Sequence, residues 1–278
     1  VDINESVTNG ATQRTTKVMH KRVLIAKIPI MLRSSLCHLS GMNSKERIKS
    51  GECTWDKGGY FIIKGNERVL ISQMRGIYNR IMVMKSKKTS KNLYSAEMRS
   101  ISGCTAHSVL VSCSITKDAD SLVVSLPYIK DAIPFITVMT VMLGHVPQNL
   151  LSSIFPGGIG AWGIAGDDFA RREIEHLIHS QIREQSLIGG FEESLDYIGS
   201  RSLYAVRKDG RTDYALQVVR RELFPHILKS DPEEGKVKLL SSFARKLLLT
   251  YIGKRAIDDR DDFELKRIDS PGQLCADL

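Results

Sequence analysis

Apolar residues follow two different patterns along the chain, and the change falls near residue 130. Before it, after a polar and aperiodic lead-in (1–20), short runs rich in branched and aromatic side chains alternate with polar turns, which is typical of β-strands. The predicted strands lie in RVLIAKIPIML (22–32), GGYFIIKGNERVLISQ (58–73), RIMVMKSKK (80–88), SAEMRSI (95–101), HSVLVSCSI (107–115) and DSLVVSLPYI (120–129). The last three form a predicted meander, with a turn at DAD (118–120).

The strand pattern between residues 58 and 73 predicts a hairpin. We place its turn at Gly65-Asn66. Its predicted apolar core is Phe61, Ile62, Ile63, Val69, Leu70 and Ile71. Before the hairpin, residues 43–52 predict one or two helical turns that end at Gly51.

Beyond residue 130 the spacing favours helices. DAIPFITVMTVMLGHV (131–146) predicts a buried helix with Pro134 in its first turn and Gly144 just past its end. An amphipathic helix follows over 167–185. Its predicted apolar stripe is Phe169, Ile174, Leu177, Ile178 and Ile182. Three further helices are predicted in FEESLDYIGSR (191–201), DYALQVVRRELFPHI (213–227) and SSFARKLLLTYIGKR (241–255). Strands followed by helices, without βαβ alternation, predict an α+β fold.

Charge narrows the range of partners. The chain of 278 residues carries a net charge of +9, which favours polyanions, nucleic acid first. Lysines gather in KSKKTSKN (85–92), where we place a domain boundary. Basic residues spread beside strands and at helix ends suit contact with a phosphate backbone. Because only 6% of residues are aromatic, a platform that stacks single-stranded bases is disfavoured. The alternative is a protein whose basic surface has no nucleic-acid partner.

Metal and catalytic signals are weak. Five cysteines without CxxC spacing argue for reduced thiols and against a structural zinc site. His176 and His179 share a helix face, which we interpret as solvated. The acidic run DDRDDFELKR (258–267) is interpreted as a self-paired segment, with Mg²⁺ binding as the alternative. No Ser/His/Asp or Cys/His set is recognisable, which lowers the expectation of a free-standing enzyme.

The segment GGIGAWG (157–163) formally matches GxGxxG. A dinucleotide-binding turn follows a strand and opens a helix, whereas here Pro156 breaks the preceding run and Asp167 would repel a phosphate. We therefore interpret the segment as a surface loop. The chain shows no signal peptide, and its most apolar stretch (132–143) is too short for a membrane span. Because the chain starts at Val1, we expect it to be a piece of a longer protein.

Seven stretches together resemble one family. They are IPIMLRSSLCHL (28–39), ECTWDKGGYFIIKGNERVLISQ (52–73), SAEMRS (95–100), SLPYIKDAIPF (125–135), SLDYIGSR (194–201), LFPHI (223–227) and DDRDDFELKRIDSPG (258–272). In this order they are similar to the second-largest subunit of multisubunit DNA-directed RNA polymerases of eukaryotes, archaea and large DNA viruses. Two features depart from that family: the glycine-rich segment 154–166 has no counterpart, and Leu265 stands where a polar or basic residue is usual.

The resemblance implies a domain organisation. Residues 1–88 correspond to part of the protrusion domain, 89–272 to the lobe, and 273–278 to the start of a return to the protrusion. The family's catalytic aspartates lie on the largest subunit, and its Mg and Zn sites lie outside this part. We therefore expect no catalytic residue, no metal ligand and no cofactor in this chain, although the whole complex is a nucleotidyltransferase.

The resemblance also implies partners. These are DNA and the RNA–DNA hybrid, the largest and the small polymerase subunits, and initiation factors on the lobe, with no membrane. The location is the nucleus, or the cytoplasm or virion for a large DNA virus.

Positions carried over from the family place Arg68 and Gln73 near the hybrid, followed by Arg75 and Asn79. The predicted nucleic-acid-binding residues are Arg68, Gln73, Arg75, Lys85, Lys87 and Lys88. For each residue a purely structural role is the alternative, such as an Arg68–Glu67 pair. Two other functions stay open: a free-standing basic nucleic-acid-binding domain, and a nucleotide-using enzyme built on the glycine-rich segment.

Overall fold

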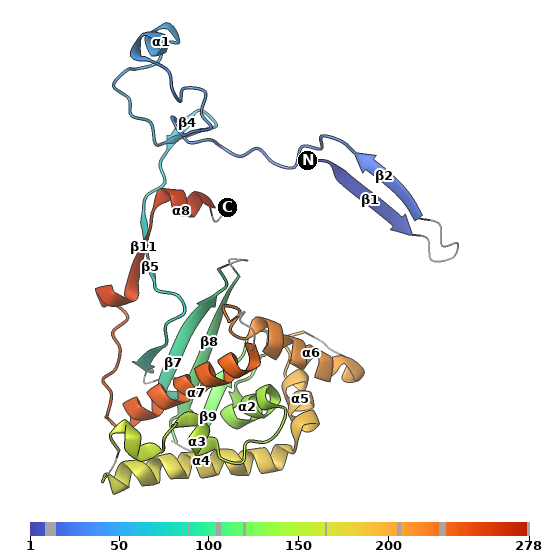
Figure 1. The fold of residues 1–278 in the computed structure, drawn as a ribbon, viewed down its shortest axis with the longest axis vertical. Coiled ribbons are helices and arrows are strands. Elements are labelled where there is room, and N and C mark those ends of the chain that lie inside the picture. The colour runs from blue at the N-terminus through green and yellow to red at the C-terminus, as the bar shows by residue number, and fades with distance from the viewer. Residues whose placement is uncertain are drawn as a thin grey trace. The chain divides into compact units, whose positions relative to one another are not determined.

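The computed structural model of the chain describes residues 1–8, 15–87, 89–103, 107–118, 121–164, 166–204, 207–227 and 232–276 (Figure 1). These residues divide into two compact units. The first contains residues 1–73 and 270–276, and the second contains 74–269. Helices and strands occur in both units, in agreement with the predicted α+β class. Within the described ranges, no helix combines the length and apolar character that crossing a membrane requires.

The first unit contains two short hairpins and two short helices. Strands β1 (Ile3–Thr8) and β2 (Thr15–His20) pair antiparallel, as do β3 (Phe61–Ile63) and β4 (Asn66–Arg68). Helix α1 (Ser44–Lys49) ends as predicted, with Gly51 at φ 78° just beyond it, and α8 (Pro271–Ala276) lies near the end of the chain.

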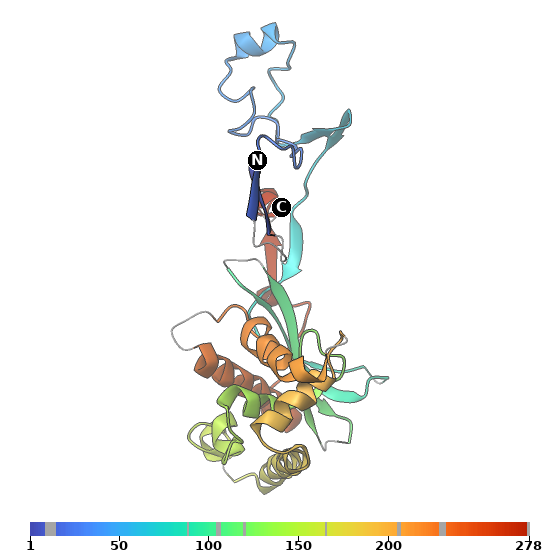
Figure 2. The same cartoon turned by 90° about the vertical axis from the view of Figure 1, so that its right-hand side faces the viewer.

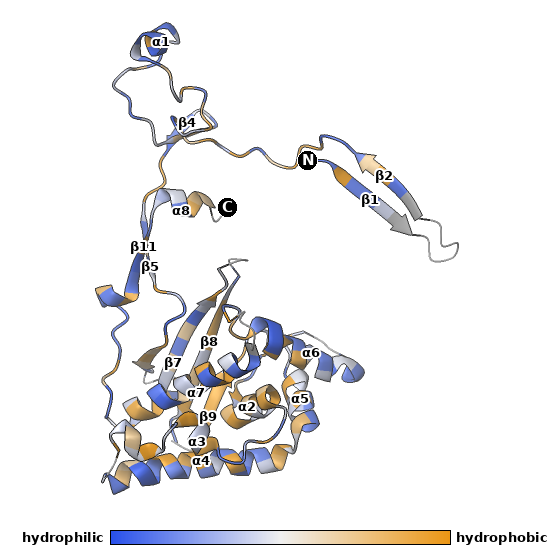
Figure 3. Ribbon diagram, in the orientation of Figure 1, coloured by the Kyte–Doolittle hydropathy of each residue, from blue (hydrophilic) through white to orange (hydrophobic). Residues whose placement is uncertain are grey.

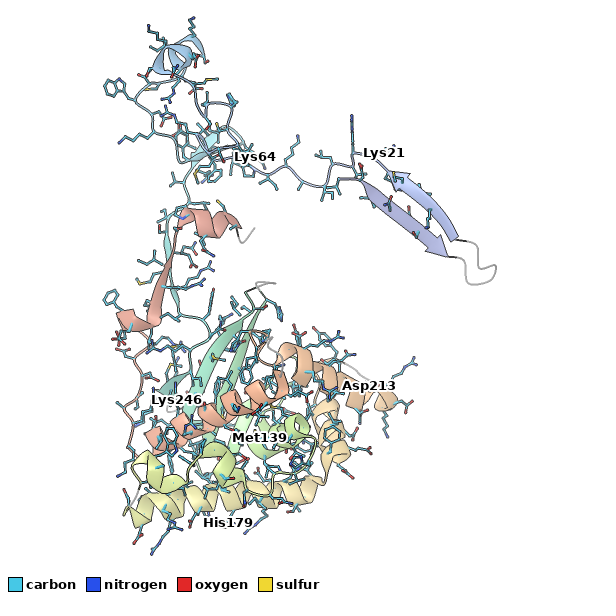
Figure 4. All side chains as sticks on the ribbon, in the orientation of Figure 1. Lys21, Lys64, Met139, His179, Asp213 and Lys246 are labelled. Carbon is cyan, nitrogen blue, oxygen red and sulfur yellow. The ribbon has the colours of Figure 1, made fainter. Side chains whose placement is uncertain are left out.

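The turn of the β3–β4 hairpin is one residue earlier than predicted. Lys64 and Gly65 occupy the two turn positions, at φ 52° and 78°, while Asn66 already belongs to β4. Two successive residues at positive φ are what a type I′ turn requires, and this turn matches the twist of the flanking strands. Figure 4 labels Lys64 at this turn.

Two predictions for the first unit are wrong. Residues 22–32 form no strand, and Ile28 is 83% exposed. A strand needs a neighbour along its length to take its backbone hydrogen bonds. The described backbone bonds of this segment to other segments lie near its two ends, from the Val23 amide to Val1 and from the Leu32 amide to Tyr60. The predicted hairpin core is also mostly not buried: Phe61 is buried, at 8% exposed, but Ile62 and Ile71 are 55% and 77% exposed.

The second unit contains a five-stranded antiparallel sheet in the order β10-β9-β8-β7-β6. Its strands are β6 (Met82–Lys85), β7 (Asn92–Ile101), β8 (Ser108–Thr116), β9 (Leu122–Ser125) and β10 (Ile133–Pro134). The predicted meander is confirmed, while the DAD turn lies partly outside the described residues. A separate ladder joins β5 (Gln73–Gly76) to β11 (Lys266–Asp269).

Helices cover one face of the sheet (Figure 2). The α-helices of this unit are α2 (Phe135–Leu143), α3 (Leu150–Ile154), α4 (Asp168–Ile188), α5 (Phe191–Ser200), α6 (Arg211–Gln217) and α7 (Pro232–Tyr251). A π-helical segment, η3 (Val218–Glu222), continues α6, and short 3₁₀ segments are η1 (Ile159–Trp162), η2 (Lys208–Gly210) and η4 (Phe263–Leu265). Helices α2 and α7 contact the strands directly.

Helix α2 is the centre of this core. Its residues from Phe135 to Met142 are buried, and all of them except Thr137 and Thr140 are apolar (Figure 3). Gly144 ends the helix at φ 77°, as predicted. Pro134 was predicted in the first turn, but it precedes the helix and is the last residue of β10. Met139, labelled in Figure 4, is fully buried on this helix.

The stripe predicted for α4 is partly wrong. Phe169 and Ile182 are exposed, whereas Gln181 and Gln185 are buried. The two glutamines accept hydrogen bonds from the first turn of α2: Gln181 Oε1 from the Ile136 amide at 3.4 Å, and Gln185 Oε1 from Thr137 Oγ1 at 2.9 Å. Because the first amides of a buried helix need acceptors, polar residues take positions that periodicity alone assigns to apolar ones. His179 is exposed on α4, as expected (Figure 4).

The division between the compact units falls at residues 73 and 74, whereas the sequence analysis placed a boundary near residue 88. Strand β6 pairs with β7 in one sheet, so the described residues of the lysine-rich segment connect two strands inside the second unit. The assignment of protrusion and lobe domains stays a prediction.

Candidate nucleic-acid interface

A groove of about 620 Å³ opens in the second unit beside β7 and the β5–β11 ladder. Four basic side chains and one acid, Glu97, are among the residues that line it. The basic side chains are Arg75, Arg99, Arg260 and Lys266. Such a concentration of cations in a concave surface attracts a phosphate backbone.

Arg75 is held in the groove by a buried carboxylate. Its Nε lies 3.5 Å from Asp269 Oδ2, and the Asp269 side chain is 4% exposed. Arg267 Nη2 donates to the same oxygen at 3.0 Å, and its guanidinium lies 3.7 Å over the Tyr78 ring. One carboxylate therefore faces two guanidinium groups, and this cluster keeps a net positive charge.

The other cations differ in their partners. Arg260 Nη2 donates to Glu97 at 3.2 Å, and Lys266 Nζ donates to Asp261 at 3.5 Å. Arg99 donates to Ser108 Oγ at 3.1 Å and has no carboxylate within ion-pair distance among the described residues. Since exposed ion pairs contribute about 1 kcal/mol or less, a phosphate group can replace such carboxylates.

The segment that carries Arg260 and Lys266 is fixed to the sheet by Asp258. Its carboxylate accepts the Val83 amide at 2.8 Å, and its own amide donates to the Val83 carbonyl at 2.9 Å. Burial raises the pKa of Asp258, but hydrogen bonds from Arg255 and from the Val83 amide outweigh this effect and hold the pKa below its ordinary value. Asp258 therefore stays charged and anchors the loop against edge strand β6.

Asn79 has a structural role in the same region. It adopts φ 58°, which asparagine tolerates better than most residues. Its side chain accepts the Ile101 amide at 2.8 Å and donates to the Ile101 carbonyl at 3.3 Å, in the manner of one more strand residue. This pairing fixes Tyr78, which lines the groove, to the end of β7.

Of the six predicted nucleic-acid residues, only Arg75 lines the groove. Arg68 is exposed on β4 opposite Phe61 and forms no ion pair with Glu67 or another described acid. Gln73 begins β5 and is exposed. Lys85 and Lys87 are exposed at the far end of β6 and in the following turn, and Lys88 lies outside the described residues. Their contact with nucleic acid stays a prediction.

The sequence analysis missed Arg99, Arg260 and Lys266. The alternation along β7 could have predicted the position of Arg99. Ala96 and Met98 are buried in the core, so Arg99 faces the opposite side of the strand. The interpretation of the acidic run 258–267 as self-paired is only partly confirmed: Lys266 pairs with Asp261 inside the run, whereas Arg260 pairs with Glu97 outside it. Two basic residues of the run also line the groove. No cluster of three or more metal-ligating side chains occurs in the described part of the chain.

The glycine-rich segment is unsuited to a dinucleotide. It forms the 3₁₀ turn η1, and Asp167 caps α4 by accepting the Ala170 amide at 3.1 Å. Lys254 lies 2.9 Å from the Asp167 carboxylate. The helix start that a phosphate would need is therefore already occupied by an acid and its cation partner.

Comparison with known proteins identifies one family. The family model described as RNA polymerase beta subunit matches residues 1–278. The chain is 35% identical over 266 residues to DNA-directed RNA polymerase II subunit RPB2 of Schizosaccharomyces pombe, covering 92% of this chain and 21% of that protein.

Archaeal and viral proteins match as well. Identity is 32% over 259 residues to DNA-directed RNA polymerase subunit Rpo2N of Methanocaldococcus jannaschii, covering 92% of this chain and 49% of that protein. It is 31% over 287 residues to the probable DNA-directed RNA polymerase II subunit RPB2 homolog of Invertebrate iridescent virus 6, covering 93% and 24%. The chain thus spans 21–22% of the first eukaryotic relatives and about half of the archaeal one.

Proposed function

The chain belongs to the RNA polymerase beta-subunit family, and from this membership we propose that it forms a non-catalytic wall of the path that nucleic acid follows in DNA-templated RNA synthesis. In the assembled nucleotidyltransferase it positions duplex DNA or the RNA–DNA hybrid, while the chemical step takes place on other parts of the enzyme. Its partners in this role are the largest subunit, the small subunits and initiation factors. The proposed location is the nucleus, or the cytoplasm or virion for a viral enzyme.

The basic groove carries this proposal. Arg75, Arg99, Arg260 and Lys266 come from segments far apart in the sequence and meet in one concavity. Their guanidinium and ammonium groups suit phosphate oxygens, which carry no sequence information, so we expect binding that is independent of sequence. The family membership also favours this function over a free-standing binding domain.

The test is the salt dependence of duplex binding. If the four cations each contact a phosphate, the affinity of the 278-residue chain for a fluorescein-labelled DNA duplex falls about a hundredfold between about 50 and 200 mM salt. Arg99→Gln weakens binding to every sequence alike and lowers the salt slope by about one.

Arg172→Gln, which removes an exposed arginine of α4 outside the groove, is the matched control and leaves the slope unchanged. A double Lys87→Glu, Lys88→Glu variant tests the lysine-rich turn separately. Binding that is insensitive to salt, or equal losses in Arg99→Gln and Arg172→Gln, contradicts the assignment of the groove.

A further inference from the structure

A second groove in the same unit has the opposite charge. It is an open depression of about 810 Å³ between the last turns of α4 and helix α5. Its acidic residues are Glu184, Glu192, Glu193 and Asp196, and the described residues that line it include no lysine, arginine or histidine. In a chain with a net charge of +9, this local reversal repels nucleic acid.

The four acidic side chains differ in how many hydrogen bonds and ion pairs they form within the chain. Glu184 accepts from Ser121 and Gln181, and Glu193 accepts the Gly190 amide. By contrast, Asp196 is only loosely paired, 3.8 Å from Arg211, and no ion pair of Glu192 with a described residue is formed. Glu192 and Asp196 lie one turn apart on α5 and are exposed, so both are available to a partner.

The groove also has an apolar side. Leu187, on the last turn of α4, lines it and is 84% exposed, and Tyr197 faces it from α5. A single exposed leucine is ordinary, but one beside a concave acidic surface supplies the apolar contact that a protein partner would cover. The described acids contain no cluster suited to a metal ion, and a small polycation would leave Leu187 uncovered.

We propose that this groove docks a cationic segment of a partner protein, with lysine or arginine side chains on Glu192 and Asp196 and an apolar side chain on Leu187. The inference rests on the proposed function, because it gives the factor-binding surface a place and a chemistry. Charge complementarity of this kind sets which partner binds and how fast, more than the final affinity.

The test uses the 278-residue chain and a fluorescein-labelled peptide of alternating lysine and leucine, followed by fluorescence anisotropy at low salt. We expect the peptide to bind, and the corresponding glutamate–leucine peptide not to bind. Glu192→Lys weakens the lysine peptide about fivefold, because an exposed attraction becomes a repulsion. Leu187→Ser weakens it about threefold through lost apolar contact.

Two matched controls separate the groove from net charge and general hydrophobicity. Glu234→Lys makes the same charge change in the first turn of another helix, α7, and Leu203→Ser removes another exposed leucine. Neither lines the groove, so neither variant changes peptide binding.

Equal binding by wild type and Glu192→Lys overturns the proposal, and so does an equal loss in Glu234→Lys. A loss in Glu192→Lys with none in Leu187→Ser also overturns it, in favour of a small polycation such as spermine. The DNA salt slope of Leu187→Ser equals that of the wild type. Failure of the peptide test is therefore distinct from failure of the proposed nucleic-acid function.

Discussion

Lys236 offers the sharpest test of the packing in the second unit. The residue lies on α7 and is 4% exposed. Its Nζ donates to the carbonyls of Arg220 at 2.5 Å and Val219 at 3.4 Å, which belong to the π-helical segment η3. Burial lowers the pKa of Lys236 from 10.5 to about 8, and the charges of Glu233 and Glu222 oppose this shift only in part.

The sign of the pH effect follows from the lowered pKa. Between about pH 8 and 10.5 the unfolded chain keeps the proton of Lys236 while the folded chain has lost it, so stability rises with pH in this window. The full shift corresponds to about 3.4 kcal/mol, of which about 2 kcal/mol is regained between pH 7 and 9.5.

Lys236→Met removes this dependence. At neutral pH the variant avoids the cost of burying a charge, but it leaves two carbonyls without their donor, which costs about 1–3 kcal/mol for each. These opposing effects leave little net change at pH 7. The informative quantity is thus the difference in unfolding free energy between wild type and variant, which grows by about 2 kcal/mol in favour of the wild type up to pH 9.5.

Urea unfolding followed by far-ultraviolet circular dichroism measures this difference. Lys238→Met is the matched control, because Lys238 lies on the same helix with its side chain 72% exposed. Its difference from the wild type stays constant with pH. A constant difference for Lys236→Met as well would refute the idea that its ammonium group is buried at a cost.

Two further predictions concern single positions. Asn79→Ala lowers the unfolding free energy by about 1–3 kcal/mol in urea titrations, because the Ile101 amide and carbonyl lose their partner. In addition, alanine adopts positive φ poorly. An unchanged urea midpoint of unfolding contradicts this role. Cys113 is fully buried, and burial raises the pKa of its thiol. A thiol reagent therefore modifies the exposed Cys53 in the native chain and Cys113 only after denaturation. Peptide mass mapping that finds Cys113 modified in the native chain contradicts this packing.

The sequence predicted best those elements whose ends and buried faces are determined by residues of the same segment. Pro134 and Gly144 delimit α2 because both residues act on their own backbone angles. The meander was predictable because alternation along β7 and β8 reflects one buried face. By contrast, residues 22–32 have the composition of a strand, but pairing depends on a neighbour that composition does not reveal.

The candidate site was less predictable for the same reason. Arg75 and Lys266 meet because β5 pairs with β11, and nothing local to either segment specifies that ladder. The acidic run 258–267 was interpreted from its own charges alone. Only the link from Asp258 to Val83 explains why Arg260 faces the groove beside Glu97.

The two grooves of the second unit explain why net charge is a poor guide to function here. A value of +9 predicts a polyanion partner, but it averages a basic groove with an acidic one. The two grooves have no lining residue in common, so each presents its own set of charged side chains. Nucleic acid is attracted to the groove of Arg99 and repelled by that of Glu192, while a cationic protein segment has the opposite preference. If both proposals hold, the two partners occupy different grooves of the same unit, and added salt weakens each interaction.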